Sequence, residues 1–262
     1  MHFRQTGYAL LLLLGAWQAV ILAFSPPRYI LPSPLAVAMS YGRQPQFLMH
    51  HALITAGEIL IGLVVGCGLG ALTALCVAAF PKTGRLVWPL VVVLQAFPVF
   101  VLAPILVIWL GFGMASKVAM TVIIIFFPVA SAFADGLRRT EPVLIDAASL
   151  TPASHFQILR HIRLPLALPA LVSGLRVAAP LAPLGAIVGE WVGAAGGLGF
   201  VMVQANARMQ TDMLFAAMVI LALFTVLLRL AVDRLTRGLA PWAREATDTS
   251  RHPSFPPRKL SA

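Results

Sequence analysis

Three polar side chains lie in segments that are otherwise apolar, and they are well placed to bind a proton or a polar molecule. An unpaired carboxylate such as Glu58 costs about 2.5–3.5 kcal/mol at the middle of a bilayer, so it should face a protein interior or snorkel outward. Glu58 could line a pathway or form a structural pair. Glu190 with Trp191 could shape an outer gate, or Trp191 could be an interfacial anchor. Gln95 could contact a polar solute or hydrogen-bond a neighbouring helix.

Other reactive patterns are absent from the sequence. The glycines between 193 and 199 follow an apolar segment and do not fit a nucleotide-binding Gly-x-Gly-x-x-Gly, so we interpret them as a flexible external connection. The six histidines are dispersed and predict no metal site. Cys67 and Cys76 fall on opposite faces of one helix, beyond disulfide reach. A membrane-embedded enzyme is therefore disfavoured, because no nucleophile, metal or carboxylate pair is arranged for catalysis.

The composition is that of a polytopic membrane protein. Of 262 residues, 60% are apolar and 11% are charged, and the mean hydropathy is +0.90. The net charge of +10 could suggest a nucleic acid partner. However, the basic residues are scattered between apolar blocks, so we interpret them as topology signals and expect no nucleic acid partner.

Six apolar runs are long enough to cross a membrane, which takes about 20 residues each. They cover residues 8–24, 52–80, 86–110, 118–134, 168–189 and 213–232. The first run could be a signal peptide, but it is longer than the usual apolar region of one, so we expect a retained anchor. The sequence therefore predicts an all-α protein with about six transmembrane helices.

The lysines and arginines predict the orientation of these helices. With a cytoplasmic N-terminus, 15 of the 19 basic residues fall inside, and only Arg28, Arg43, Lys117 and Arg208 fall outside. Both termini are therefore expected in the cytoplasm. Residues 1–240 form the predicted transmembrane domain, and 241–262 are too polar to fold and form a predicted disordered tail.

Glycines and prolines mark two further features of the apolar runs. Gly62, Gly66 and Gly70 are spaced by four residues, which predicts a helix face that another backbone can approach closely. The run 86–110 contains Pro89, Pro98 and Pro104, and the run 168–189 contains Pro180 and Pro183. Each proline removes a helical hydrogen bond, so these helices should be kinked.

Between the fourth and fifth runs, residues 135–165 form a charged loop that does not read as disorder. Thr140 with Pro142, and Thr151 with Pro152, predict the starts of two short helices. Pro165 should exclude Leu164 from the α conformation and end the second helix.

The second of these helices is amphipathic. Phe156, Leu159 and Ile162 share one side, and Gln157, Arg160, His161 and Arg163 fill much of the rest. Such a helix could lie on the membrane surface with its arginines on anionic lipid, or it could bind a partner protein.

The loop resembles the EAA signature of permeases from binding-protein-dependent ABC importers. Asp146-Ala147-Ala148 stands at the Glu-Ala-Ala position, and Ile162-Arg163-Leu164-Pro165 matches the Ile-x-Leu-Pro ending at the expected spacing. Asp146 replaces the usual Glu. Pro152 occupies the usual Gly position, which excludes a left-handed turn there and requires a helix restart. The resemblance implies a type I ABC importer permease fold with a cytoplasmic coupling-helix loop.

Further segments are similar to one branch of that family, which handles sulfonate, taurine, nitrate and thiamine precursors. They include the segments 95–104, 108–113, 173–176 and 189–199. Within that branch, Gln95-Ala-Phe-Pro98, Phe127-Pro128, Asp135-Gly-Leu-Arg-Arg139 and the segment 204–210 look most like permeases for hydroxymethylpyrimidine, the pyrimidine precursor of thiamine.

The resemblance implies the partners and the mechanism. Two permease copies would pair in the inner membrane, receive solute from a periplasmic binding protein, and seat their loops in a groove of cytoplasmic ATPase subunits. The coupling residues would be Asp146, Ala147, Ala148, Pro152, Phe156, Leu159, Ile162, Leu164 and Pro165. The chain has no Gly-x4-Gly-Lys-Ser/Thr loop, so ATP and Mg should bind the partner and no cofactor is expected here. A gradient-driven carrier using Glu58 or Glu190 is the alternative, although no inverted repeat is visible.

Overall fold

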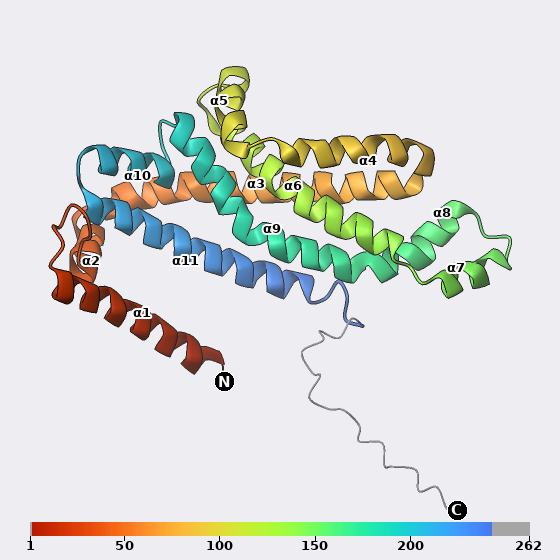
Figure 1. Cartoon of the computed structure of the whole chain (residues 1–262), viewed down its shortest axis with the longest axis horizontal. Helices are drawn as coiled ribbons and strands as arrows, with labels where there is room; N and C mark the ends of the chain where they lie inside the picture. The colour runs from red at the N-terminus through yellow and green to blue at the C-terminus, as the bar shows by residue number, and fades with distance from the viewer. Residues whose placement is uncertain (1, 243–262) are drawn as a thin grey trace, which may run out of the picture.

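In a computed structural model, residues 2–242 are described, and they form helices joined by short connections (Figure 1). The helices are α1 (His2–Phe24), α2 (Pro34–Arg43), α3 (Pro45–Ala79), α4 (Pro81–Ala96), α5 (Val99–Leu110), α6 (Met114–Arg138), α7 (Pro142–Ser149), α8 (His155–Ile158), a π-helical turn (Leu159–Arg163), α9 (Leu164–Gly193), α10 (Leu198–Ala207) and α11 (Thr211–Thr236). The all-α prediction is confirmed. All but the first two residues of the predicted tail 241–262 lie outside the described residues.

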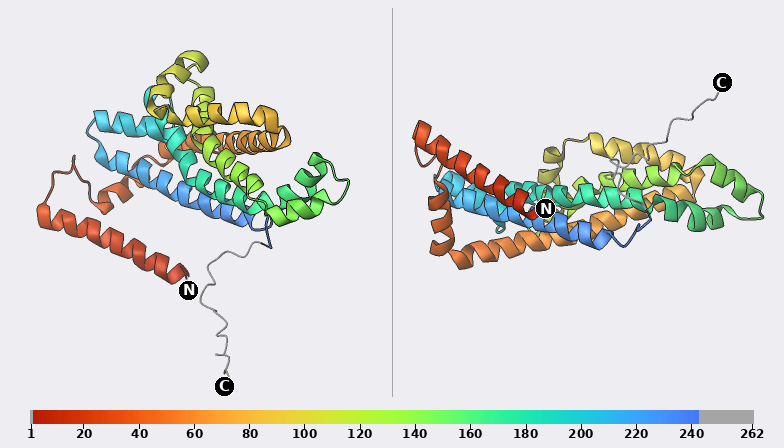
Figure 2. Two further views of the ribbon diagram at one scale, coloured as in Figure 1. Left: turned by 45° about the vertical axis from the view of Figure 1, so that its right-hand side comes forward. Right: turned by 90° about the horizontal axis from the view of Figure 1, so that it is seen from below.

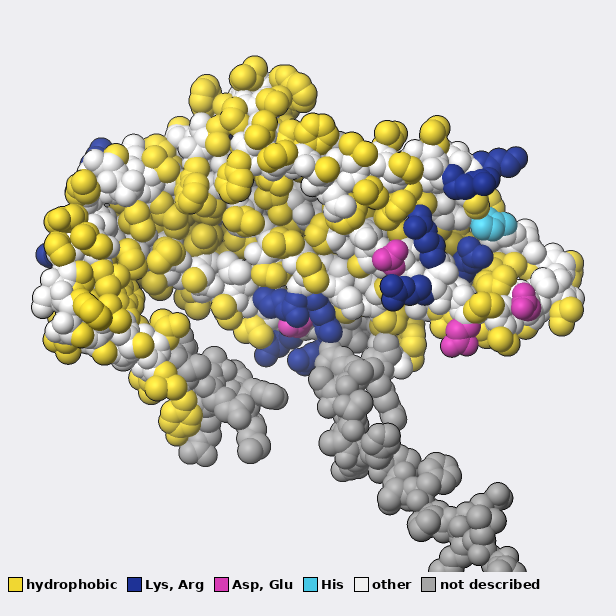
Figure 3. All heavy atoms as spheres, viewed as in Figure 1, with side chains coloured by type: hydrophobic (Ala, Val, Ile, Leu, Met, Phe, Trp, Pro, Cys, Tyr) yellow, Lys and Arg dark blue, Asp and Glu magenta, His cyan; other side chains and the backbone are white. Residues whose placement is uncertain are grey.

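Four helices within residues 2–242 are long and apolar enough to cross a membrane. They are Pro45–Ala79, Met114–Arg138, the continuous helix His155–Gly193 and Thr211–Thr236. Figures 1 and 2 show these helices lying side by side along the long axis of the molecule. Apolar side chains cover most of the visible face in Figure 3, whereas lysines and arginines gather in two groups, one at the lower middle of the view and one toward the end that carries α7 and α8.

The remaining two predicted spans take different forms. The run 8–24 lies within α1. Most of this helix projects away from the other helices (Figure 2, left). The run 86–110, predicted as one kinked span, is divided into α4 and α5. Phe97 is extended, with φ −70° and ψ 130°, because a residue before proline is forced out of the α region. Pro98 thus separates the helices, while Pro89 and Pro104 lie within them.

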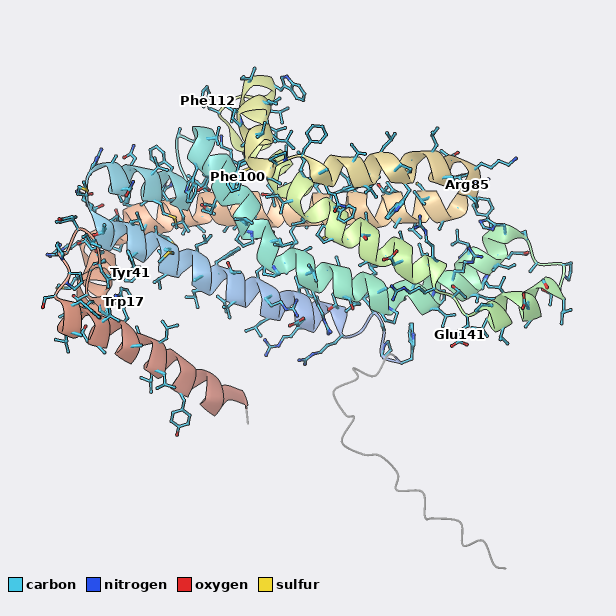
Figure 4. The ribbon with its side chains drawn as sticks, in the orientation of Figure 1. Trp17, Tyr41, Arg85, Phe100, Phe112 and Glu141 are labelled. Carbon is cyan, nitrogen blue, oxygen red and sulfur yellow. The ribbon has the colours of Figure 1, made fainter. Side chains whose placement is uncertain are left out.

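The ends of α1 and α2 dock at the end of the bundle opposite α7 and α8. The rings of Trp17 and Phe215 lie 5.5 Å apart, and the Tyr41 hydroxyl donates a 3.0 Å hydrogen bond to the Ala216 carbonyl. Figure 4 shows Trp17 and Tyr41 near each other at this end. These contacts join α1 and α2 to the start of α11.

The predicted glycine face on α3 is confirmed as a helix contact. Gly62, Gly66 and Gly70 are buried against α6. A Cβ added at Gly66 would lie 2.6 Å from Ile125 Cγ1, and one at Gly70 would lie 2.9 Å from the Phe126 carbonyl oxygen. The missing side chains therefore let the α3 and α6 backbones approach closely.

Replacing Gly185 with alanine should destabilise the fold by about 3 kcal/mol, since the added Cβ would overpack the contact between α9 and α6. That Cβ would lie 2.5 Å from the Cα of Thr121, a backbone atom that no side-chain rotation can move. Gly68→Ala is the matched control, because nothing lies within 4 Å of a Cβ at that position. Thermal unfolding of both purified variants, followed by loss of helical signal, measures the difference. Equal stability of the two variants would contradict this account of the contact.

Candidate functional site

The loop between α6 and α9 contains the two short helices that the sequence predicted. Helix α7 starts after Glu141, with Pro142 in its first turn, and none of its residues is buried. The prediction that Thr140 caps this helix is wrong. Its hydroxyl is buried without a hydrogen-bond partner, and Glu141 occupies the cap position.

The break between α7 and α8 lies near Pro152, as predicted. However, the residue that caps the start of α8 is Ser154 and not Thr151. Thr151 donates a 2.7 Å hydrogen bond to the Ala148 carbonyl and so closes the end of α7. Ser154 caps α8: its hydroxyl accepts from the Gln157 amide at 3.3 Å, and its own amide donates to Gln157 Oε1 at 2.7 Å. The Ser-x-x-Gln spacing is a capping-box signal that the sequence reasoning missed.

Pro165 does not end the helix, so that prediction is also wrong. Leu164 has α-helical angles, φ −62° and ψ −50°, and its amide donates to the carbonyl of Leu159, five residues back. This π-helical turn widens the helix just before the proline, which gives the ring room where an α-helical carbonyl would clash. Consequently α8 continues into α9 as one helix from His155 to Gly193.

The predicted coupling residues divide between the surface and the interior. Asp146, Ala147, Pro152 and Phe156 are exposed, Ala148, Ile162, Leu164 and Pro165 are half-buried, and Leu159 is buried. Leu159 packs in a core cluster with Phe133 and Leu137 of α6. Because it is buried within the permease itself, this side chain is not free to contact a partner protein.

Helix α8 also rests on the end of α3. The Phe156 ring meets Phe80 edge to face, with 6.0 Å between ring centres, and His155 Nε2 lies 3.0 Å from the Ala78 carbonyl oxygen. The surface left for a partner comprises α7, the turn after it and the exposed side of α8 (Figure 1).

At the other end of α9, three charged residues are buried together. Glu58 of α3 is 3% exposed, Glu190 of α9 is 2% exposed and Lys117 of α6 is 1% exposed. The carboxyl groups of Glu58 and Glu190 contact each other, and both lie close enough to Lys117 to attract it. Buried charges are found paired because isolation from water is costly. Glu58 Oε2 is buried without a hydrogen-bond partner, so both alternatives for Glu58 stay predictions.

Glu190 holds the start of α10. Its Oε1 accepts a 2.6 Å hydrogen bond from the Thr55 hydroxyl, and its Oε2 accepts one from the Gly199 amide. The Leu198 amide donates to Thr55 Oγ1 at 2.7 Å. The expectation that residues 193–199 are only a flexible connection is therefore wrong at their C-terminal end.

Gly197 completes this junction. Its amide donates to His51 Nδ1 at 3.0 Å, and its φ of +106° lies in a region that glycine adopts readily and other residues rarely do. Three consecutive amides at the start of α10 are thus bound by side chains of α3 and α9. A helix start offers such unpaired amides, and the Glu190 carboxyl accepts a hydrogen bond from one of them.

Lys117 joins the same region from α6. Its ammonium group donates to the carbonyl of Phe112 at 2.7 Å, to the hydroxyl of Ser116 at 3.2 Å and to the carbonyl of Gly193. The sequence reasoning counted Lys117 as an external basic residue. Its place next to an apolar run was a signal for a buried charge.

The other two predicted pathway residues lie apart from this cluster. Gln95 is exposed on α4, and Trp191 is 53% exposed near the end of α9. The structure therefore buries Glu190 but leaves its neighbour Trp191 at the surface. The role of Gln95 and Trp191 in a pathway stays a prediction.

Comparison with known proteins identifies the chain. Residues 62–245 match the family described as binding-protein-dependent transport system inner membrane component. The chain belongs to this family. It is therefore a permease subunit of an ABC importer, a non-catalytic membrane component that works with ATPase and solute-binding partners.

Two relatives align over most of their length. The permease is 45% identical to a Haemophilus influenzae protein named "Probable ABC transporter permease protein", over 85% of this chain and 91% of that protein. It is 35% identical to the formylaminopyrimidine transport permease protein ThiX of Halalkalibacterium halodurans, over 90% and 94% of the two chains.

A solved structure shares the fold. The methionine ABC transporter MetNI, in an inward-facing conformation, aligns with a TM-score of 0.58 and 23% identity, covering 74% of this permease and 94% of that chain. The type I importer fold expected from the loop resemblance is thereby confirmed.

Proposed function

We propose that this permease carries a pyrimidine precursor of thiamine, with hydroxymethylpyrimidine or a close relative as its solute. The support is the 35% identity to a permease named for formylaminopyrimidine, together with the segments around Gln95, Asp135 and Gln204. Sulfonate, taurine and nitrate are the other candidate solutes, because the same branch of the family handles them.

The transport is driven, in this proposal, by ATPase subunits that bind ATP and Mg and grip the loop of residues 135–165. The main support for this coupling role of the loop is the continuous helix from His155 to Gly193. Its 39 residues are about 58 Å long at 1.5 Å per residue, enough to cross a bilayer. A displacement of α8 would therefore move α9 directly, without a flexible joint between the loop and the membrane.

A second copy of the permease completes the pathway in this proposal. Helices α4 and α5 stand at one side of the bundle (Figures 1 and 2), and Figure 4 shows Phe100 and Phe112 near the two ends of α5. Several of their apolar side chains are exposed, among them Leu90, Phe100, Ile108 and Trp109. Packing of two such faces would cover these side chains and place Gln95 near the dimer interface.

The orientation follows the distribution of basic residues. We place α7, α8 and both termini in the cytoplasm, and the cluster of Glu58, Lys117 and Glu190 toward the periplasmic binding protein. In this arrangement Glu190 fixes the start of α10 on the side where solute is delivered.

The test is transport into proteoliposomes that contain the permease, its ATPase and its binding protein. Labelled hydroxymethylpyrimidine should accumulate only with ATP and all three components, and taurine and nitrate should not compete. Uptake driven by a proton gradient without the ATPase would instead support a gradient-driven carrier. Competition by taurine or nitrate would overturn the solute and leave the ATP-driven mechanism standing.

A further inference from the structure

A cavity of about 380 Å³ lies where α3 ends, α4 begins and α6 ends. Most of its lining residues are small or apolar, and three are arginines. They are Ala74, Val77, Ala78, Pro81, Gly84, Arg85, Trp88, Pro89, Ala134, Leu137, Arg138 and Arg163. The predicted coupling residues and the buried charge cluster do not line it.

The three arginines come from three different elements and share no carboxylate. Arg85 lies on α4, near its start (Figure 4), Arg138 ends α6, and Arg163 ends the π-helical turn. Within residues 2–242, no ion pair joins any of the three to an acidic side chain. Such a concentration of unpaired positive charge around one cavity is suited to an anion.

Two further contacts indicate how the cavity is built. Arg163 Nε is buried and has no hydrogen-bond partner, so a donor faces the interior without an acceptor. The guanidinium carbon of Arg138 lies 4.6 Å from the centre of the Trp88 ring, a cation–π contact that orients it. A phosphate group in the cavity would place a negative charge beside these arginine side chains.

We propose that this cavity binds the phosphate headgroup of an anionic membrane phospholipid such as phosphatidylglycerol. The cavity lies where the long apolar helices end, which is the level of the headgroups. Its apolar walls, including Val77 and Leu137, would contact the glycerol and the upper acyl chain of a lipid. A free phosphate ion has no apolar part and would make no such contacts. The bound lipid would bridge α4, α6 and the turn that joins α8 to α9.

Native mass spectrometry of the full-length permease, with phosphatidylglycerol or phosphatidylcholine added, tests this proposal. Phosphatidylglycerol should bind more tightly, and Arg85→Gln and Arg138→Gln should each weaken it about fivefold, since one basic contact is worth about 1 kcal/mol. Arg85 is exposed, so its loss leaves the core intact. Arg139→Gln and Lys82→Gln are the matched controls, because neither residue lines the cavity, and both should bind as the wild type does.

Three outcomes would overturn the proposal. One is equal affinity of the permease for phosphatidylglycerol and phosphatidylcholine. Another is a loss of phosphatidylglycerol affinity in the control variants as large as that in Arg85→Gln and Arg138→Gln. The third is release of phosphatidylglycerol by millimolar inorganic phosphate or by the purified ATPase, which would assign the cavity to a soluble anion or to a partner side chain.

Discussion

Replacing Ala148 with glutamate should reduce ATP-driven uptake about a hundredfold while the permease still inserts and folds. Helix α7 has no buried residue, so the change leaves the core of the chain untouched. If α7 docks in a groove of the ATPase, the new carboxylate is buried there without a partner. Such a charge costs about 3 kcal/mol, which corresponds to about a hundredfold.

Uptake and substrate-stimulated ATP hydrolysis should fall together in proteoliposomes, because both need the loop to be gripped. Ala148→Ser is the control for position, since it adds a small uncharged group. Asp146 offers a second matched pair: Asp146→Lys should impair coupling, whereas Asp146→Glu restores the residue usual in the family and should retain it. Wild-type transport by Ala148→Glu and Asp146→Lys would rule out this loop as the coupling element.

The sequence predicted the features that depend on local pattern. Apolar runs identified the long helices, the spacing of Gly62, Gly66 and Gly70 identified a close helix contact, and Pro152 identified the break between two short helices. Each of these signals lies within a few turns of one helix. Packing against neighbouring helices does not change the local structure that these signals indicate.

The errors arose where a distant segment changed the local outcome. Pro165 carries a helix-ending signal, but α9 packs tightly along α6 and the widened turn before the proline keeps the helix intact. Similarly, Gly196 and Gly197 suggest flexibility when read alone. Their loop is fixed by His51 and Thr55, more than 140 positions earlier in the chain, and no local pattern reveals such partners.

The buried charges show the same limit. Glu58 and Glu190 were recognised as unusual, yet the sequence left open whether they line a pathway or pair. Lys117 was counted only as a basic residue on the outer side of the membrane, and its burial was not predicted from the sequence. Only the packing of α3, α6 and α9 brings the three together.

Replacing Glu190 with leucine should lower the free energy of unfolding by about 3 kcal/mol, because a buried hydrogen-bonding group that loses its partner costs about 1–3 kcal/mol. The change would leave the Gly199 amide without its acceptor, the Thr55 hydroxyl with only the His51 carbonyl at 3.2 Å, and Lys117 with one carboxyl group fewer nearby. Asp212→Ala is the matched control. Asp212 pairs with Arg28 at 3.0 Å, where the arginine side chain is 63% exposed, and such pairs are worth about 1 kcal/mol or less.

Hydrogen exchange at the start of α10 separates a structural Glu190 from one that only lines a pathway. If Glu190 holds this segment, Glu190→Leu should speed exchange at the amides of Leu198 and Gly199, while amides in the middle of α6 stay protected. Glu190→Gln keeps one acceptor oxygen and turns the other position into a donor, so it should give an intermediate rate. Lys117→Met combined with Glu190→Leu should cost less than the sum of the two single changes, because each removes a charge that the other had compensated. Unchanged exchange at Gly199 together with lost uptake would instead assign Glu190 to the solute pathway.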